Sequence, residues 1–174
     1  MNNEIIITER LIIRELTIGD LIDFYKLEND PQVRKYIPNM YRSTFNECRD
    51  NLRKHINKYS YNSGLHTWGV VLEENKEFIG ITGYRYLKDL NAVEIGIRLL
   101  PDYWSKGYAT ESGKALLTYG FTELGLKEII AMALPENKKS MKSLENIGME
   151  FEGYGYFRGS LVAYFKKERY NFIC

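Results

Sequence analysis

The order of β-prone and helix-prone segments in the middle of the chain is the feature that most restricts its fold. Three β-prone runs cover residues 68–72, 78–86 and 93–100, and short polar turns separate them. A Pro-Asp pair at 101–102 stops the third run, and a helix is expected at about 109–124, with Gly125 in the position of a C′ glycine. The pattern predicts an antiparallel meander that leads through one loop into a long helix.

Signals on both sides of this meander complete the pattern of an α+β protein. Two β-prone runs open the chain, and Thr17 and Thr44 each precede an acidic residue by three positions, as helix-capping residues do. A further β-prone run at 129–134 precedes a helix from Asn137, and an aromatic tail contains a hairpin turn at Arg158. We expect a mixed, mostly antiparallel central sheet of about seven strands flanked by helices.

Length and composition exclude several classes of protein. The 174 residues fit one domain, 1–174, and 44% of them are hydrophobic, which excludes a disordered chain. The formal net charge of +1 argues against a dedicated nucleic-acid binder. No apolar run is long enough to span a membrane, and the N-terminal segment lacks the features of a signal peptide. Because Cys48 and Cys174 suit a reducing compartment, we expect a cytoplasmic protein without membrane or nucleic-acid partners.

The loop between the third strand and the long helix is the first candidate site. Gly107 permits backbone angles that other residues avoid, and small Ala109 leaves room beside it. The first turn of a helix offers unpaired N–H groups at the positive end of the helix dipole, which favours a phosphate. Many strand–glycine–helix turns bind nothing, so a purely structural turn is the alternative. The glycine spacings of a P-loop and of a dinucleotide-binding fold are both missing.

Three motifs in the same order along the chain resemble the GNAT superfamily of acetyltransferases. Residues 94–111 read EIGIRLLPDYWSKGYATE and resemble its acetyl-CoA motif, with Trp104 where many members have Gln or Arg. Residues 135–149 read PENKKSMKSLENIGM, and residues 8–14 read TERLIIR. The resemblance is greatest to the branch that includes the ribosomal-protein N-terminal acetyltransferases and the spermidine acetyltransferases.

This resemblance implies a fold with two splayed central strands and an acetyl-CoA site in the gap between them. Backbone N–H groups of the loop would hold the pyrophosphate, and the pantetheine arm would lie along the third strand of the meander like an added strand. The implied contacts are Ile97, Arg98, Leu99, Ser105, Lys106, Gly107, Tyr108, Ala109, Thr110, Asn137 and Ser140. Lys138, Lys139 and Lys142 would either meet the nucleotide phosphate or form a solvated helix face.

Glu94 and Ser140 are the candidate catalytic residues. Glu94 shares one strand face with Gly96 and Arg98, where it is either the general base or the partner of Arg98 or of another cation in an ion pair. The resemblance implies a hydroxyl acid for the leaving thiolate. Leu144 stands where many relatives have Tyr, so Ser140 is the nearest hydroxyl, with a capping or cofactor-contacting role as its alternative. No metal site is expected, since the two histidines have no partners at ligand spacing.

The expected activity is transfer of an acetyl group from acetyl-CoA to a primary amine by direct attack in a ternary complex. The acceptor would be either a protein N-terminus or a small molecule, bound between residues 21–61 and 154–164. Those segments are rich in aromatic residues and poor in acids, which disfavours a strongly cationic acceptor. The alternative function is a non-catalytic acyl-CoA-binding module, and the expected assembly is a monomer or a homodimer.

Overall fold

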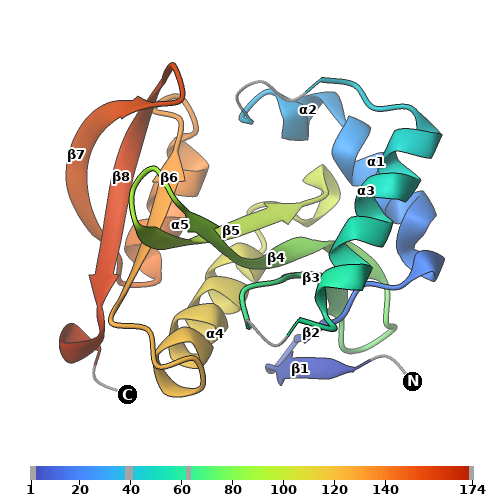
Figure 1. Cartoon of the computed structure of the whole chain (residues 1–174), viewed down its shortest axis with the longest axis horizontal. Coiled ribbons are helices and arrows are strands. Elements are labelled where there is room, and N and C mark those ends of the chain that lie inside the picture. The colour runs from blue at the N-terminus through green and yellow to red at the C-terminus, as the bar shows by residue number, and fades with distance from the viewer. Residues whose placement is uncertain (1–2, 38–40, 62–63, 173–174) are drawn as a thin grey trace.

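A single sheet of eight strands forms the centre of the computed structural model, which describes residues 3–37, 41–61 and 64–172 (Figure 1). The strands are β1 (Glu4–Ile7), β2 (Leu11–Arg14), β3 (Thr67–Leu72), β4 (Phe78–Leu87), β5 (Ala92–Leu99), β6 (Glu128–Ala133), β7 (Glu150–Phe157) and β8 (Ser160–Glu168). The helices are α1 (Leu21–Asn29), α2 (Pro31–Arg34), α3 (Phe45–Lys58), α4 (Tyr108–Thr122) and α5 (Lys138–Asn146). The strand order is β1-β2-β3-β4-β5-β6-β8-β7.

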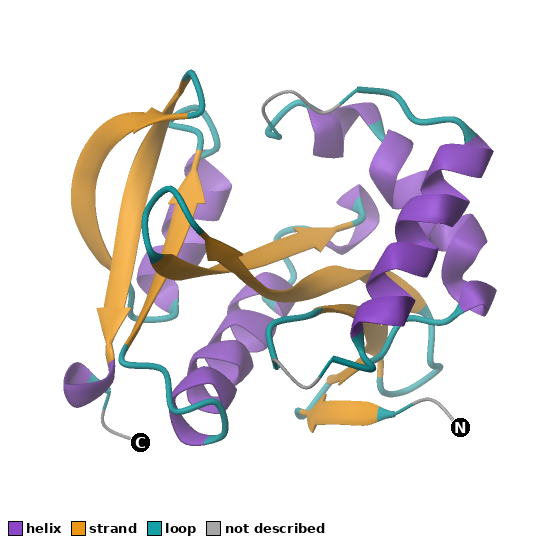
Figure 2. Cartoon of the chain, viewed as in Figure 1, coloured by secondary structure: helices purple, strands orange, loops and turns teal. Residues whose placement is uncertain are grey.

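Strand pairing divides the sheet into two antiparallel parts joined at one place. The pairs within β1 to β5 and within β6 to β8 are antiparallel, whereas β5 and β6 run parallel. Only Glu94 and Ile130 are matched across that parallel junction. Beyond it the two strands separate, and Figure 2 shows β6, β7 and β8 diverging from β4 and β5. The splay implied by the family resemblance is therefore present.

Two apolar clusters fill the two sides of the sheet. Leu11 and Ile13 of β2 pack in a cluster with residues of α4 and α5, while Ile12 between them packs with residues of α1 and α3. Alternate residues of a strand point to opposite faces, so a strand covered on both sides must be apolar throughout. Cys48 lies 1% exposed in the second cluster, as its position on an apolar helix stripe predicts. Cys174 lies outside the described residues.

The predicted start of helix α3 is confirmed. Thr44 accepts the N–H of Glu47, and the Glu47 carboxylate accepts the N–H of Thr44 at 2.7 Å, so α3 begins with a capping box. Helix α1 ends before Pro31 as predicted. Helix α2 was not predicted, and it begins at that proline because the Asp30 carboxylate caps its first N–H groups.

The sheet has eight strands, one more than the expected number of about seven. The first of the two β-prone runs at the start of the chain forms β1, which is four residues long, lies at the edge and pairs with β2 in an irregular register. Across the described residues, none of the helices combines the length and hydrophobicity needed to cross a membrane.

Candidate active site

The separation of β5 from β6 opens a cleft of about 1240 Å³. One wall is β5 with the loop that follows it, and the opposite wall is β6 with the start of α5. Residues of α1, α2 and the β7–β8 turn line its remaining sides. All the predicted site residues line this cleft except Lys106 and Tyr108.

The loop after β5 has a backbone that few residues adopt. Gly107 has a φ of 85° and Ser105 a φ of 61°, both in the left-handed region. Glycine adopts this region without strain, which accounts for Gly107, whereas Ser105 must be held there by its surroundings. Helix α4 then begins at Tyr108, and the first three N–H groups of a helix have no partner within it. Gly107, Ala109 and Thr110 line the cleft, so the loop presents to it a helix start of the kind that can bind an anion.

Trp104 secures this loop to the strand before it. Its indole Nε1 donates a hydrogen bond to the carbonyl of Leu99 at 2.7 Å, at the end of β5. The indole ring also packs against both apolar clusters. Tryptophan therefore fits the position where many family members have Gln or Arg, because it anchors the loop by packing and by one hydrogen bond.

Lys106 and Tyr108, which do not line the cleft, stack with neighbouring side chains. The ammonium of Lys106 lies 5.4 Å from the ring centre of Tyr103, and the guanidinium of Arg10 lies 4.7 Å from the ring centre of Tyr108. Both arrangements are cation–π contacts. The family resemblance gives these two residues a contact with the pyrophosphate through their backbone N–H groups.

Glu94 lies at the junction of β5 and β6 and is only 7% exposed. Its Oε2 accepts hydrogen bonds from Nε and Nη2 of Arg85, at 3.1 and 2.5 Å. Burial raises the pKa of the Glu94 carboxyl, and the positive charge of Arg85 opposes that rise without cancelling it. A buried carboxyl with a raised pKa in a cleft has the properties of a general base that works near neutral pH.

Of the two ion pairs considered for Glu94, the one with Arg98 is absent, whereas the one with another cation is present and is formed by Arg85. Arg98 instead donates from Nη1 to Oε1 of Glu28 at 2.6 Å, and Glu28 belongs to α1. Residues 94 and 98 lie four apart on one strand, about 13 Å along its axis, which is too far for a direct pair. Cross-strand neighbours are closer, and Arg85 is directly opposite Glu94 in the β4–β5 register.

Ser140 and Asn137 occupy the start of α5 on the other wall of the cleft. The Asn137 side chain accepts the N–H of Ser140 at 3.1 Å, so Asn137 caps the start of α5. Ser140 is partly buried and lines the cleft, as does Leu144 one turn further along. Ser140 therefore lines the same cleft as Glu94, on the opposite wall.

The remaining candidates divide between the cleft and other surroundings. Lys138 and Lys139 line the cleft, whereas Lys142 pairs with Glu145 at 3.0 Å on the exposed side of α5. His55 packs edge-on against Phe24, and burial lowers its pKa to about 4. Among the residues that the structure describes, no group of three or more His, Cys, Asp or Glu could hold a metal ion.

Some residues of the site were not predicted from the sequence. Arg85 was overlooked although a signal existed, because a hairpin with its turn at residues 88–91 sets Arg85 opposite Glu94. Thr82 was also overlooked, and its buried hydroxyl donates to the Gly96 carbonyl at 3.1 Å. Glu28 had no local signal, since only the packing of α1 against the sheet brings it to the cleft.

Comparisons with known proteins agree with this geometry. The model of the acetyltransferase (GNAT) domain matches residues 10–150. The chain is 37% identical over 150 residues to the uncharacterized N-acetyltransferase YnaD of Bacillus subtilis, covering 86% of this chain and 84% of that protein. It is 30% identical over 145 residues to the spermidine N(1)-acetyltransferase of Escherichia coli strain K12, covering 81% of this chain and 73% of the relative.

Solved structures show the same relationship. A GNAT-family acetyltransferase from Bacillus anthracis superposes with a TM-score of 0.83 at 30% identity, covering 98% of this chain and 99% of the other. Structures of ribosomal-protein acetyltransferases also share the fold, at identities that show the fold alone. The family model and the relatives each cover most of the chain. The chain belongs to the GNAT family of acetyltransferases.

Proposed function

We propose that the enzyme transfers the acetyl group of acetyl-CoA to a primary amine by direct attack within the cleft, in a ternary complex. The observation that carries this proposal is the single matched pair between β5 and β6, beyond which the strands open between the Gly107 loop and the start of α5. A cleft of this kind can admit donor and acceptor together. In this proposal, residues 1–174 form one acetyltransferase domain.

The residues along the cleft fit acetyl-CoA. The helix start at Gly107 suits its pyrophosphate, and the edge of β5 from Ile97 to Leu99, beyond its one matched pair with β6, suits an extended pantetheine arm. Lys138 and Lys139 supply positive charge on the α5 side of the cleft. Acetyl-CoA supplies the acetyl group in an activated thioester.

Glu94 is the proposed general base. Amine attack on the thioester carbon forms the C–N bond and breaks the C–S bond, and the attacking nitrogen must lose a proton. Glu94 accepts that proton, directly or through one water, because its carboxylate lies in the cleft and its pKa is raised by burial. Arg85 orients the carboxylate by holding one of its two oxygens, Oε2, and leaves Oε1 available.

Ser140 is the proposed proton donor to the departing thiolate. Its hydroxyl lines the cleft opposite β5, and the Asn137 cap fixes the first turn of α5 on which it lies. Leu144, at the position where many family members have tyrosine, is 7% exposed and has no proton to give. A serine hydroxyl is a weaker acid than a tyrosine, so this contribution is the smaller of the two.

The acceptor is proposed to be a protein N-terminus or a small primary amine without several positive charges. Glu28 and Glu94 both line the cleft, and each faces an arginine that offsets its charge. Neither of these two carboxylates is left without a counter-charge, so neither favours binding of a polycation. The related Escherichia coli enzyme is named for spermidine, so an acceptor panel must include polyamines beside peptides and small amines.

Ligand-dependent thermal stability tests the donor site. A ligand that binds only the native state at 100 times its Kd stabilises it by about 2.7 kcal/mol, which is about 5–10 °C in Tm for a chain of this size. Acetyl-CoA is expected to produce such a shift, and NAD and ATP are not. No shift with millimolar acetyl-CoA would overturn the donor assignment. A shift without turnover of any amine would favour the acyl-CoA-binding module.

The proposed location is the cytoplasm. Cys48 carries a free, buried thiol, which is compatible with a reducing compartment.

A further inference from the structure

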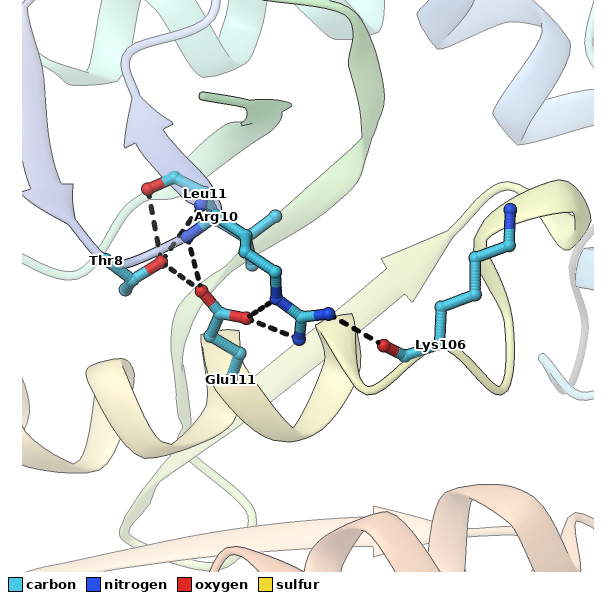
Figure 3. A network of polar contacts seen from close by, with 5 residues as sticks. All are labelled: Thr8, Arg10, Leu11, Lys106 and Glu111. Carbon is cyan, nitrogen blue, oxygen red and sulfur yellow. Dashed lines mark hydrogen bonds and ion pairs between the residues drawn. The ribbon is translucent and has the colours of Figure 1, made fainter. Parts of the chain in front are cut away.

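A polar network joins the turn between β1 and β2 to the Gly107 loop, about 100 residues further along the chain (Figure 3). Its centre is the carboxylate of Glu111, in the first turn of α4. The other members are Thr8 and Arg10, from the β1–β2 turn, and the backbone carbonyl of Lys106. Neither the donor site nor the catalytic pair described above accounts for this network.

Both carboxylate oxygens of Glu111 accept hydrogen bonds. Oε1 accepts the Thr8 hydroxyl at 2.7 Å and the backbone N–H of Arg10 at 2.9 Å, while Oε2 accepts Nε of Arg10 at 2.7 Å. Nη2 of Arg10 also lies 2.6 Å from Oε2. Burial alone would raise the pKa of Glu111, but these bonds outweigh it and hold the pKa below its usual value. The β1–β2 turn is thereby fixed to the helix that begins at the loop.

Arg10 also holds the loop itself. Its Nη1 donates to the carbonyl of Lys106 at 3.1 Å (Figure 3). In a trans peptide the carbonyl of one residue and the N–H of the next point in opposite directions. Holding the Lys106 carbonyl toward Arg10 therefore turns the N–H of Gly107 away from Arg10. Gly107 lines the cleft, so the bond sets the direction of an N–H group at the proposed pyrophosphate site.

The loop needs such support because its conformation is not one that its sequence prefers. Lys106 lies between Ser105 and Gly107, both with positive φ, and that conformation is sterically unfavourable for Ser105. The fork of an arginine can hold two acceptors in fixed relative positions. Here it holds the Glu111 carboxylate and the Lys106 carbonyl at once, and its guanidinium also lies over the Tyr108 ring.

We propose that Arg10 is a positioning residue for acetyl-CoA, which fixes the Gly107 loop in its anion-binding conformation by bridging Glu111 and the Lys106 carbonyl. The inference rests on the proposed role of the Gly107 loop as the pyrophosphate site. Arg10 acts through the loop backbone and takes no part in acetyl transfer. Its partial exposure, 45% of the side chain against 16% for Glu111, keeps it at the surface beside the site.

Titration calorimetry with coenzyme A on Arg10→Met tests the inference without knowledge of the acceptor. The Kd is expected to rise about tenfold, the scale of losing one hydrogen bond to a charged group that orders a site. The fitted stoichiometry is expected to stay at the wild-type value, because folded molecules remain binding-competent. A merely structural role for Arg10 would lower the stoichiometry or the Tm and leave the Kd unchanged, which would overturn the proposal.

Three further variants separate positioning from charge and from misfolding. Arg10→Lys keeps the positive charge but lacks the forked guanidinium, so it is expected to recover only part of the coenzyme A affinity. If Arg10→Met does not fold, Arg10→Lys replaces it as the test. In Arg10→Met combined with Glu111→Gln, most of the loss is expected to remain. Full recovery in that double variant would mean that Arg10 only neutralises Glu111. Arg53→Met is the matched control, since Arg53 is an exposed arginine on α3 paired weakly with Asp50.

Gly107→Val distinguishes failure of this inference from failure of the proposed donor site. If Gly107→Val weakens coenzyme A binding but Arg10→Met leaves the Kd unchanged, the loop holds the ligand and Arg10 has no part in it. If Gly107→Val binds with the wild-type Kd, the loop is not the pyrophosphate site, and the role of Arg10 is refuted together with it.

Discussion

Replacing Glu94 by glutamine removes the proposed base with little change of shape. The glutamine amide can still accept a hydrogen bond from Arg85, but it cannot take up a proton from the amine. General bases contribute about 10² to 10⁴ in rate, so kcat is expected to fall at least about 100-fold, which is about 2.7 kcal/mol of activation barrier. Binding of acetyl-CoA is expected to be unchanged, because the proposed donor contacts are backbone groups elsewhere.

The effect on stability is expected to be much smaller. Arg85 is 64% exposed, and an ion pair with so exposed a partner stabilises by about 1 kcal/mol or less. Because burial raises the pKa of Glu94 in the folded state, that carboxyl favours folding only at low pH and loses this contribution as pH rises through its folded pKa. Glutamine carries no charge to bury, so the variant is expected to unfold within about 1 kcal/mol of the wild type at neutral pH.

A pH–rate profile with one good amine acceptor separates these effects. The wild-type kcat is expected to fall on the acid side as Glu94 becomes protonated, and the variant is expected to lack that limb. Its deficit is expected to shrink at high pH, where the amine is already neutral. Arg85→Met is expected to move the wild-type acid limb to higher pH, since Arg85 lowers the pKa of Glu94. Glu73→Gln, on the exposed β3–β4 turn, is the control. A Glu94→Gln variant with wild-type kcat across neutral pH would refute the assignment.

Three other variants test separate parts of the account. Ser140→Ala is expected to lower kcat by about tenfold or less, which is below the usual range for acid–base catalysis, because water can replace the hydroxyl. If the Kd for coenzyme A rises while kcat stays at the wild-type value, Ser140 is a ligand contact and not the acid. Gly107→Val is expected to abolish coenzyme A binding while the circular dichroism spectrum stays native. A branched residue at a φ of 85° strains the loop, and its Cβ would lie 3.2 Å from Nη2 of Arg10. Unchanged affinity for coenzyme A would mean that the loop has only a structural role. Asp20→Asn is expected to destabilise the fold by about 3 kcal/mol at neutral pH, because it leaves buried Arg14 without its counter-charge. Hydrogen bonds from Arg14 and Thr17 outweigh the effect of burial and lower the pKa of Asp20. The wild type is therefore expected to lose its stability advantage over the variant only as pH falls through that lowered pKa. Equal denaturation midpoints of the two proteins at pH 7 would contradict the assignment.

Much of the fold was predictable because its signals are local. The Thr44 capping box and the turn at Arg158 depend on neighbours within a few residues, and both appear where expected. Strand β2 was recognised from its run of β-prone residues, and the two buried clusters on either side explain why it is apolar throughout. Helix α4 was expected at about 109–124 and lies at Tyr108–Thr122. Helix α2 was missed because Pro31 ends one helix and starts another, and only the Asp30 cap decides between a loop and a helix at that point.

The candidate site was less predictable because it is assembled from distant segments. The motif around Gly107 located the loop, but the partners of its charged neighbours come from elsewhere in the chain. Arg98 was one of the partners considered for Glu94, whereas tertiary packing pairs it with Glu28 of α1. The bond from Arg10 to Lys106 spans 96 residues and has no periodicity that would reveal it.

The measurement that tests the central claim most directly is release of the coenzyme A thiol during turnover. The protein is mixed with acetyl-CoA and a panel of peptide N-termini, small primary amines and polyamines, and the products are identified by mass spectrometry. We expect thiol release that depends on one class of amine, equals the amount of N-acetylated product and is lost in Glu94→Gln. Binding of acetyl-CoA with thiol release no faster than in the absence of every amine would contradict the proposed activity.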